Sequence, residues 1–145
     1  MSVIILENSR PEIAEAIYSV TQESYKQEAS LLGLEHFPLL DKTANEITKD
    51  QGTYYGVFFT GSLAGVLHFN FGNIDSLVVR PCFQRLGVAE KLLSHLFAEA
   101  KGIEITVSTA ELNMPATSLY QKVGFSLVNT SQKSGIRIVT YAKML

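Results

Sequence analysis

The spacing of hydrophobic residues in the first third of the chain predicts one strand followed by two helices. Residues 3–7 are mostly apolar and β-branched, which is typical of a strand. Residues 9–12 (Ser-Arg-Pro-Glu) and 43–46 (Thr-Ala-Asn-Glu) both have the capping-box pattern, so we expect a helix to begin at each. The first of these helices is expected to run to about Ser30, because the following side chains recur at helical spacing: Ile13, Ile17, Thr21, Ser24 and Tyr25.

The middle of the chain is rich in aromatic and β-branched residues and predicts three consecutive antiparallel strands. Residues 54–60 and 63–71 form a hairpin with a tight turn between them. A second tight turn leads into a strand over residues 74–80.

The hydrophobic period changes after Gly87 and predicts a helix over residues 88–101. Gly102 ends this helix, and residues 103–108 alternate as a further strand. Strand 74–80, the helix and strand 103–108 therefore form a β-α-β unit with parallel strands and a right-handed crossover.

The last quarter of the chain adds a short helix from Pro115 to Gly124 and a hairpin of residues 125–128 and 136–143. The full order is β-α-α-β-β-β-α-β-α-β-β. It predicts an α+β fold with a mixed, mostly antiparallel central sheet and helices on both faces. The length of 145 residues suits a single domain over residues 1–145.

Composition and charge exclude several classes of function. The chain is 46% hydrophobic with a net charge of −2 and no basic cluster, so nucleic acid is a poor candidate partner. Cys82 is the single cysteine, so we expect no internal disulfide and no metal site, and a reducing cytoplasmic setting fits. The apolar runs are too short to cross a bilayer and the first residues lack the features of a signal peptide, so we expect no membrane association.

Residues 84–89 (Gln-Arg-Leu-Gly-Val-Ala) are the most informative stretch, because they join a strand to the start of a helix. The first helical turn has N–H groups without intrahelical partners and a partial positive charge, so a phosphate fits there. Gly87 lets a ligand approach the backbone, and Arg85 adds positive charge. A single glycine also fits an ordinary strand-to-helix loop, and neither the dinucleotide fingerprint nor the nucleoside triphosphate loop is present.

Two motifs in the sequence carry a family resemblance. Residues 77–89 (Leu-Val-Val-Arg-Pro-Cys-Phe-Gln-Arg-Leu-Gly-Val-Ala) contain Gln84, Gly87 and Ala89 in the spacing Gln/Arg-x-x-Gly-x-Gly/Ala, and Asn-x-x-Ala-x-x-Leu-Tyr-x-Lys-x-Gly-Phe follows at 113–125. Together they resemble the two signatures of the GNAT superfamily of N-acetyltransferases. The order of the predicted elements agrees as well, so the resemblance covers the whole chain.

The resemblance implies acetyl-CoA as cosubstrate, without a metal. The main chain of Val78 and Val79 would hydrogen-bond the pantetheine arm, and an amide there would stabilise the oxyanion of the reaction. Asn113 would reach the pantetheine or phosphate region and can also cap its helix. The residues expected to bind the cosubstrate are Leu77, Val78, Val79, Gln84, Arg85, Leu86, Gly87, Val88, Ala89, Asn113 and Tyr120.

Two residues are candidates for proton transfer. Tyr120 lies where the family often places a general acid, and a phenol is protonated at neutral pH. The alternative is a tyrosine that only packs against its neighbours. Asp75 is the nearest substitute for the glutamate that many relatives carry as base, and its alternative is a solvated aspartate at a strand edge.

The resemblance further implies direct acetyl transfer to a primary amine of a small molecule or peptide. The expected acceptor pocket has hydrophobic walls and one carboxylate: Tyr25, Glu28, Phe37 and Leu39. Alternatively, Phe37 and Leu39 cover the core and Glu28 is solvated. Transfer from another acyl-CoA and an acyl-CoA sensor without catalysis both stay open at this point, as does a homodimer.

Overall fold

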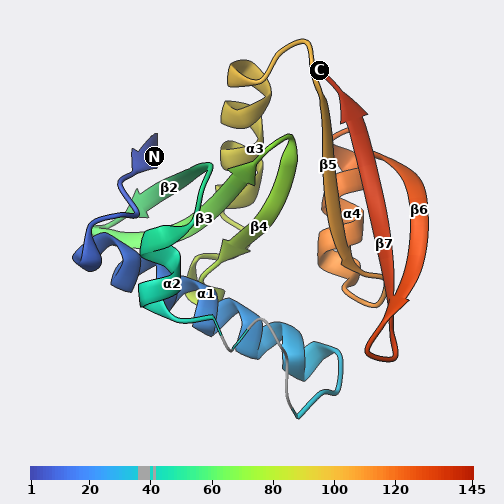
Figure 1. The fold of residues 1–145 in the computed structure, drawn as a ribbon, viewed down its shortest axis with the longest axis horizontal. Coiled ribbons are helices and arrows are strands. Elements are labelled where there is room, and N and C mark those ends of the chain that lie inside the picture. Colours follow the sequence, from blue (N-terminus) through green and yellow to red (C-terminus); the bar gives the residue numbers. More distant parts are fainter. Residues whose placement is uncertain (36–39, 41) are drawn as a thin grey trace.

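The computed structural model describes residues 1–35, 40 and 42–145, which form a seven-stranded sheet with helices on both faces (Figure 1). The elements follow the order predicted from the sequence, with a short 3₁₀ helix, η2, added. They are β1 (Val3–Leu6), α1 (Pro11–Leu31), α2 (Ala44–Lys49), β2 (Thr53–Phe59), β3 (Ser62–Asn70), β4 (Asn73–Val79), η2 (Pro81–Phe83), α3 (Val88–Glu99), β5 (Glu104–Ala110), α4 (Met114–Lys122), β6 (Ser126–Lys133) and β7 (Ile136–Met144).

The sheet has the strand order β1-β2-β3-β4-β5-β7-β6. Its strand pairs are antiparallel except for β4 and β5, which run parallel on either side of the α3 crossover. The predicted fold class and the predicted parallel β-α-β unit are therefore confirmed. None of the helices among the described residues is long and apolar enough to cross a membrane.

The two predicted capping boxes have different outcomes. The box at Thr43 is confirmed, because Thr43 Oγ1 accepts from the Glu46 N–H at 3.2 Å and Glu46 Oε1 accepts from the Thr43 N–H at 3.1 Å. The prediction of a capping box at Ser9 is wrong. The N-cap of α1 is Arg10 without a side-chain cap, and Glu12 pairs with the Arg10 guanidinium at 2.6 Å instead of reaching back to the main chain.

Strand β6 is longer than the sequence predicts. The prediction stops at Val128, whereas β6 runs to Lys133 and pairs with β7 along its length. All eight of its residues are exposed, so burial imposes no alternation of apolar and polar residues on this edge strand. Its hydrogen bonds to β7 define it instead.

Two hydrophobic clusters hold the helices against the sheet. One lies between α3, α4 and one face, and its fully buried members include Leu92, Leu93 and Leu96. The other lies between α1, α2 and the opposite face and includes Ile17 and Ile47. Both long helices are thereby fixed on opposite sides of the strands that carry the candidate site.

Strands β4 and β5 separate soon after they meet. Their register contains two pairs, Asn73 with Thr106 and Ile74 with Val107, and beyond Ile74 the strands diverge (Figure 1). The Thr106 hydroxyl donates to Asn73 Oδ1 at 2.8 Å at this junction. The divergence leaves one side of β4 without a neighbouring strand, and the candidate site lies there.

Candidate active site

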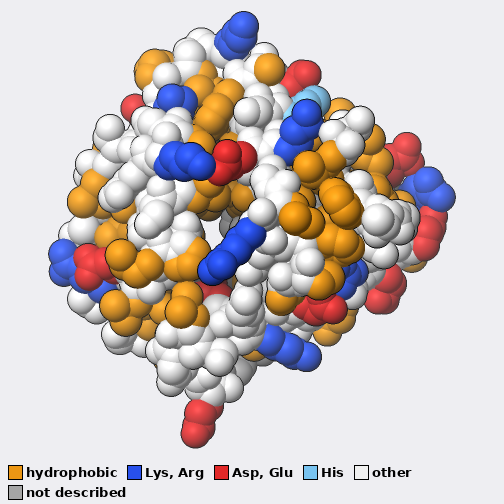
Figure 2. All heavy atoms as spheres, turned by 180° about the vertical axis from the view of Figure 1, so that it is seen from behind, with side chains coloured by type: hydrophobic (Ala, Val, Ile, Leu, Met, Phe, Trp, Pro, Cys, Tyr) orange, Lys and Arg blue, Asp and Glu red, His pale blue; other side chains and the backbone are white. Residues whose placement is uncertain are grey.

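A cavity of about 890 Å³ lies where β4 and β5 separate. Its walls come from α1, β4, the turn into α3, β5, α4 and the β6–β7 hairpin. The face of the molecule in Figure 2 is hollowed near its centre, where basic side chains lie beside hydrophobic ones. The following residues predicted from the sequence line the cavity: Tyr25, Glu28, Asp75, Leu77, Val78, Val79, Gln84, Arg85, Gly87, Val88, Ala89, Asn113 and Tyr120.

Three predicted residues are placed differently or are not placed. Leu86 is 47% exposed and is not among the lining residues, so its side chain contributes nothing to the cavity wall. Phe37 and Leu39 lie outside the described residues. The expected acceptor pocket therefore rests here on Tyr25 and Glu28.

The turn into α3 leaves open space in front of the helix. Gly87 is the N-cap with φ +80°, and a Cβ built there would have no atom within 4 Å. The side chain of Gln84 secures the turn by donating to Gln27 Oε1 of α1 at 2.7 Å and to the carbonyl of Val79 at 3.3 Å. Free N–H groups, a helix dipole and Arg85 face this space, so a phosphate of coenzyme A fits it.

The register of β3 and β4 decides which main-chain groups of β4 are free. The Arg80 N–H donates to the Ala64 carbonyl at 2.8 Å, so Val78, two residues earlier, also exchanges hydrogen bonds with β3. The groups of Leu77 and Val79 therefore point away from β3 into the cavity. The Val79 carbonyl accepts from Gln84, which leaves the Val79 N–H for the contact expected from the resemblance, whereas the main chain of Val78 is turned toward β3.

Tyr120 on α4 is a buried residue of the cavity wall. Its ring is 5% exposed and packs against Phe125 and Tyr141 at centroid distances of 5.6 and 6.2 Å. Burial raises the pKa of its phenol well above the ordinary value, and the charge of Glu28 and then Tyr25 add to this effect. Its hydroxyl has no hydrogen-bond partner among the described residues, so Tyr120 is both a packed side chain and a protonated, available donor.

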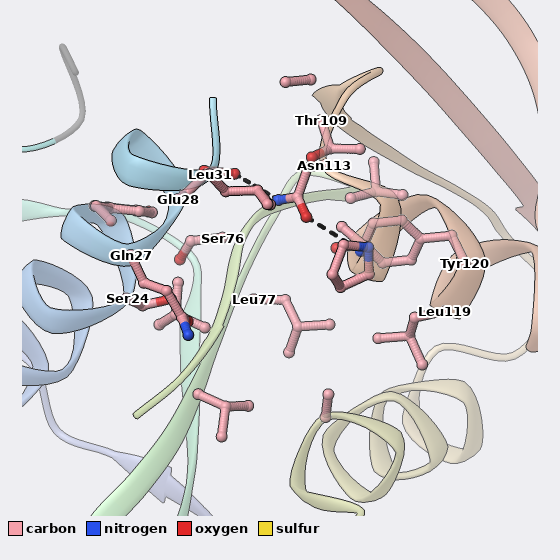
Figure 3. A pocket seen from close by; sticks show the side chains of 18 of the residues that line it. Ser24, Gln27, Glu28, Leu31, Ser76, Leu77, Thr109, Asn113, Leu119 and Tyr120 are labelled. Carbon is pink, nitrogen blue, oxygen red and sulfur yellow. Dashed lines mark hydrogen bonds between the residues drawn. The ribbon is translucent and has the colours of Figure 1, made fainter. Parts of the chain in front are cut away.

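Glu28 and Asn113 join α1 to α4 across the cavity. Asn113 Nδ2 donates to Glu28 Oε1 at 2.7 Å, and Asn113 Oδ1 accepts from the Ala116 N–H at 3.3 Å as the N-cap of α4 (Figure 3). Burial raises the pKa of the Glu28 carboxyl, and the hydrogen bond from Asn113 opposes part of this rise. The predicted cap is confirmed, while the rest of the Asn113 side chain faces Glu28.

Tyr25 lies next to this pair on α1. Burial raises the pKa of its phenol to about 12, with a further contribution from the Glu28 charge. A hydrogen bond with the Ser76 side chain lowers this pKa, and the charge of Asp75 raises it. Tyr25 lines the same cavity as the two carboxylates, Glu28 and Asp75.

Asp75 is held by neighbours on the sheet. It lies at an irregularity in the β3–β4 register, and its carboxylate accepts from Asn73 Nδ2 at 2.7 Å and Asn70 Nδ2 at 3.4 Å. His68 Nδ1 is 3.7 Å from the same carboxylate, and His68 Nε2 is 2.7 Å from the Gln51 carbonyl. A carbonyl only accepts, so Nε2 carries a proton. The contact of His68 with Asp75 has no signal in the sequence, where His68 is one residue of an alternating strand.

The model of the acetyltransferase (GNAT) family matches residues 14–125. This chain belongs to the GNAT acetyltransferase family. It is 31% identical over 130 residues to the UPF0157 protein YqkA of Bacillus subtilis (strain 168), a match that covers 86% of this chain and 38% of that protein. The chain thus spans well under half the length of that relative.

Solved structures share the GNAT fold at low sequence identity. The ribosomal-protein-S18-alanine N-acetyltransferase from Escherichia coli is 18% identical with a TM-score of 0.74, over 97% of this chain and 91% of that one. A GNAT family acetyltransferase from Elizabethkingia anophelis with acetyl-CoA bound is 20% identical with a TM-score of 0.56, over 65% of this chain and 76% of that one. These likenesses concern the fold.

This GNAT chain has one further ion pair at the cavity that the sequence does not predict. Lys122 Nζ of α4 lies 2.9 Å from Glu90 Oε1 in the first turn of α3, and both residues line the cavity. Lys122 occupies the lysine position of the second motif, which is the signal that points to it. Among the described residues, no group of three or more His, Cys, Asp or Glu side chains is arranged to hold a metal ion.

Proposed function

We propose that this protein transfers the acetyl group of acetyl-CoA directly to a primary amine of a small molecule or peptide. The observation that carries the proposal is one cavity whose wall includes both the open N-terminus of α3 and Tyr120. Membership of the GNAT family supports the same reaction class. The Elizabethkingia anophelis relative with acetyl-CoA bound supports the choice of cosubstrate.

The chain has a suitable group for each part of coenzyme A. The N–H groups at the start of α3 and the side chain of Arg85 bind the phosphates. The main-chain groups of Leu77 and Val79 bind the pantetheine arm in the manner of an added strand. The acetyl thioester then lies toward Tyr120, which lines the same cavity.

The reaction needs no covalent enzyme intermediate. The neutral amine attacks the thioester carbonyl, so that a C–N bond forms and the C–S bond breaks. The leaving sulfur takes a proton from the Tyr120 hydroxyl, whose raised pKa keeps this proton in place until charge develops on sulfur. The ammonium proton of the acceptor goes to a base, for which the sequence points to Asp75.

The charges of the acceptor end favour a cationic acceptor. Glu28 and Asp75 both line the cavity beside Tyr25, which also lines it, and the charge of each raises the pKa of the Tyr25 phenol. Neither carboxylate has a lysine or arginine partner among the described residues. An alkylammonium complements this end, whereas an acidic acceptor is repelled. The Escherichia coli relative acts on an alanine of a ribosomal protein, so a peptide amine is within the range of acceptors that the fold accommodates.

A coupled assay of thiol release tests the proposal. The full chain is incubated with acetyl-CoA and a panel of cationic, neutral and acidic primary amines, and free coenzyme A thiol is followed over time. We expect amine-dependent turnover that is highest for cationic amines. Faster turnover with propionyl-CoA than with acetyl-CoA would show that acetyl-CoA is not the preferred acyl donor. Tight coenzyme A binding without turnover on any amine would instead establish a sensor.

A further inference from the structure

Among the described residues, one oxygen of the Glu28 carboxylate accepts a hydrogen bond and the other does not. Asn113 Nδ2 donates to Oε1 at 2.7 Å, and Oε2 has no hydrogen-bond donor in the part of the chain that the structure describes. Asp75 differs, because Asn73 donates to one of its oxygens and Asn70 to the other, which also lies near the His68 ring. Of the two carboxylates, Glu28 is the one with an oxygen free to receive a proton.

Glu28 is also the carboxylate that is tied to the helix of the general-acid candidate. Asn113, which donates to Glu28 Oε1, is the N-cap of α4, the helix that carries Tyr120, and the charge of Glu28 contributes to the raised pKa of Tyr120. The charge of Asp75 acts on Tyr25 and Tyr54 and is not among the causes of the Tyr120 shift. The amine must meet the thioester carbonyl close to the leaving sulfur, so the base has to lie on the Tyr120 side of the cavity.

We propose that Glu28 is the general base of the transfer and that Asn113 is the residue that positions it. This inference rests on the proposed function. The acceptor ammonium gives one proton to Glu28 Oε2, which leaves a neutral amine and a neutral carboxyl group. The amine then forms the C–N bond while sulfur leaves with the Tyr120 proton. The proton that C–N bond formation leaves on nitrogen passes to the Tyr120 phenolate, and after product release the Glu28 proton passes to water, so that the net reaction yields amide, coenzyme A thiol and one proton.

Asn113 contacts both Glu28 and the helix that carries Tyr120. Its Nδ2 fixes Glu28 on α1, and its Oδ1 caps the first turn of α4, the helix that carries Tyr120. A shift of either helix therefore changes both contacts of one side chain. The distance between base and acid is set by a residue that needs no contact with the substrate.

The surroundings of Glu28 suit a base that works near neutral pH. Burial raises the pKa of its carboxyl, which makes the carboxylate a better proton acceptor than an exposed one. The titratable groups around it are Tyr25 on α1 and Tyr120 on α4, whose phenols are neutral at pH 7 and whose pKa values burial raises further. Other charged groups line the same cavity: Asp75 on β4, Arg85 and Glu90 at α3, Lys122 on α4 and Lys133 on β6.

The test is the pH profile of kcat/KM for a cationic amine in four variants. Glu28→Gln should lower kcat about a hundredfold and remove the acidic limb of the profile. Asp75→Asn should keep that limb. Asn113→Ser keeps a good helix cap but loses the donor to Glu28, so the limb should move to higher pH. Glu15→Gln, the same substitution at an exposed site of α1, should match the wild type.

Two results would overturn the inference. The first is an acidic limb that disappears in Asp75→Asn and persists in Glu28→Gln, which would assign the base to Asp75 while the transferase stands. The second comes from carbon-13 NMR titration of the Glu28 carboxyl, which needs no turnover. A Glu28 pKa at or below 4.5 that Asn113→Ser does not change would exclude the positioned base. Failure of the proposed function is recognised separately, because the wild type would then turn over no amine.

Discussion

The hydroxyl of Thr106 donates to Asn73 Oδ1 at 2.8 Å at the point where β4 and β5 part. The side-chain amide of Asn73 also donates to the Asp75 carboxylate at 2.7 Å. One side chain therefore connects the point where the strands separate to the candidate base Asp75. The strands diverge directly beyond this contact. Their divergence frees the main chain of β4 and creates the cavity on which the following predictions depend.

Gly87→Glu should abolish coenzyme A binding while the fold survives. The space beside Gly87 is open, so the new side chain fits the protein but places bulk and negative charge where a phosphate is expected. The left-handed φ of +80° adds strain of about 1–2 kcal/mol. Isothermal titration calorimetry with coenzyme A measures the effect.

Gly102→Glu is the matched control for this substitution. Gly102 follows the opposite end of α3, has φ +86° and likewise has no atom within 4 Å of its added Cβ. The control should show a similar loss of stability with unchanged coenzyme A affinity. Equal affinities in the two variants would show that the turn does not hold the phosphates.

Tyr120→Phe should lower kcat about a hundredfold or more and leave acetyl-CoA affinity nearly unchanged. The substitution keeps the ring contacts with Phe125 and Tyr141 and removes the proton. The hydroxyl has no partner among the described residues, so the free energy of unfolding should not fall. Steady-state kinetics measures the change in kcat, and urea denaturation measures the free energy of unfolding. A kcat within about threefold of wild type would show that Tyr120 is not the general acid.

Gly65→Ala should destabilise the protein by about 1–3 kcal/mol, because a Cβ on Gly65 would lie 2.5 Å from Val88 Cγ1 and 3.2 Å from the Val78 carbonyl. Val88 is in the first turn of α3, so coenzyme A affinity should fall as well. Val88→Ala makes room for the new methyl group. The double variant should therefore be more stable than the sum of the single effects predicts, whereas strict additivity would show that the two sites do not touch.

The raised pKa of Glu28 makes a prediction about stability and pH. The folded protein binds the Glu28 proton more tightly than the unfolded chain, whose carboxyl has a pKa near 4.5. Stability contributed by Glu28 is therefore present at pH 4 and is lost as pH rises through the folded pKa. Relative to Glu28→Gln, the wild type should have a lower free energy of unfolding at pH 7 than at pH 4. If the difference in free energy of unfolding between the two proteins did not change with pH, Glu28 would not be a buried carboxyl with a raised pKa.

The fold was largely predictable because burial leaves a recognisable pattern of hydrophobic residues in most elements. Strands β2 and β3 are buried over consecutive residues and appear as continuous apolar runs, whereas helix α3 buries one face and shows helical spacing. The second half of β6 buries nothing, so its polar residues carry no such signal. The helix start at Arg10 was missed because the Arg10–Glu12 ion pair competes with the cap, and a capping pattern does not reveal this competition.

The sequence by itself determined the family and pointed to the turn at Gly87 as the candidate phosphate site and to Tyr120 as the candidate acid, since each depends on residues that are close along the chain. The tertiary structure alone decided the pairing of Glu28 with Asn113, which are 85 positions apart. It also decided that Leu77 and Val79, rather than Val78, turn their main-chain groups to the cavity. Both depend on how α1, β3 and α4 pack around β4, and packing between distant elements leaves no local pattern in the sequence.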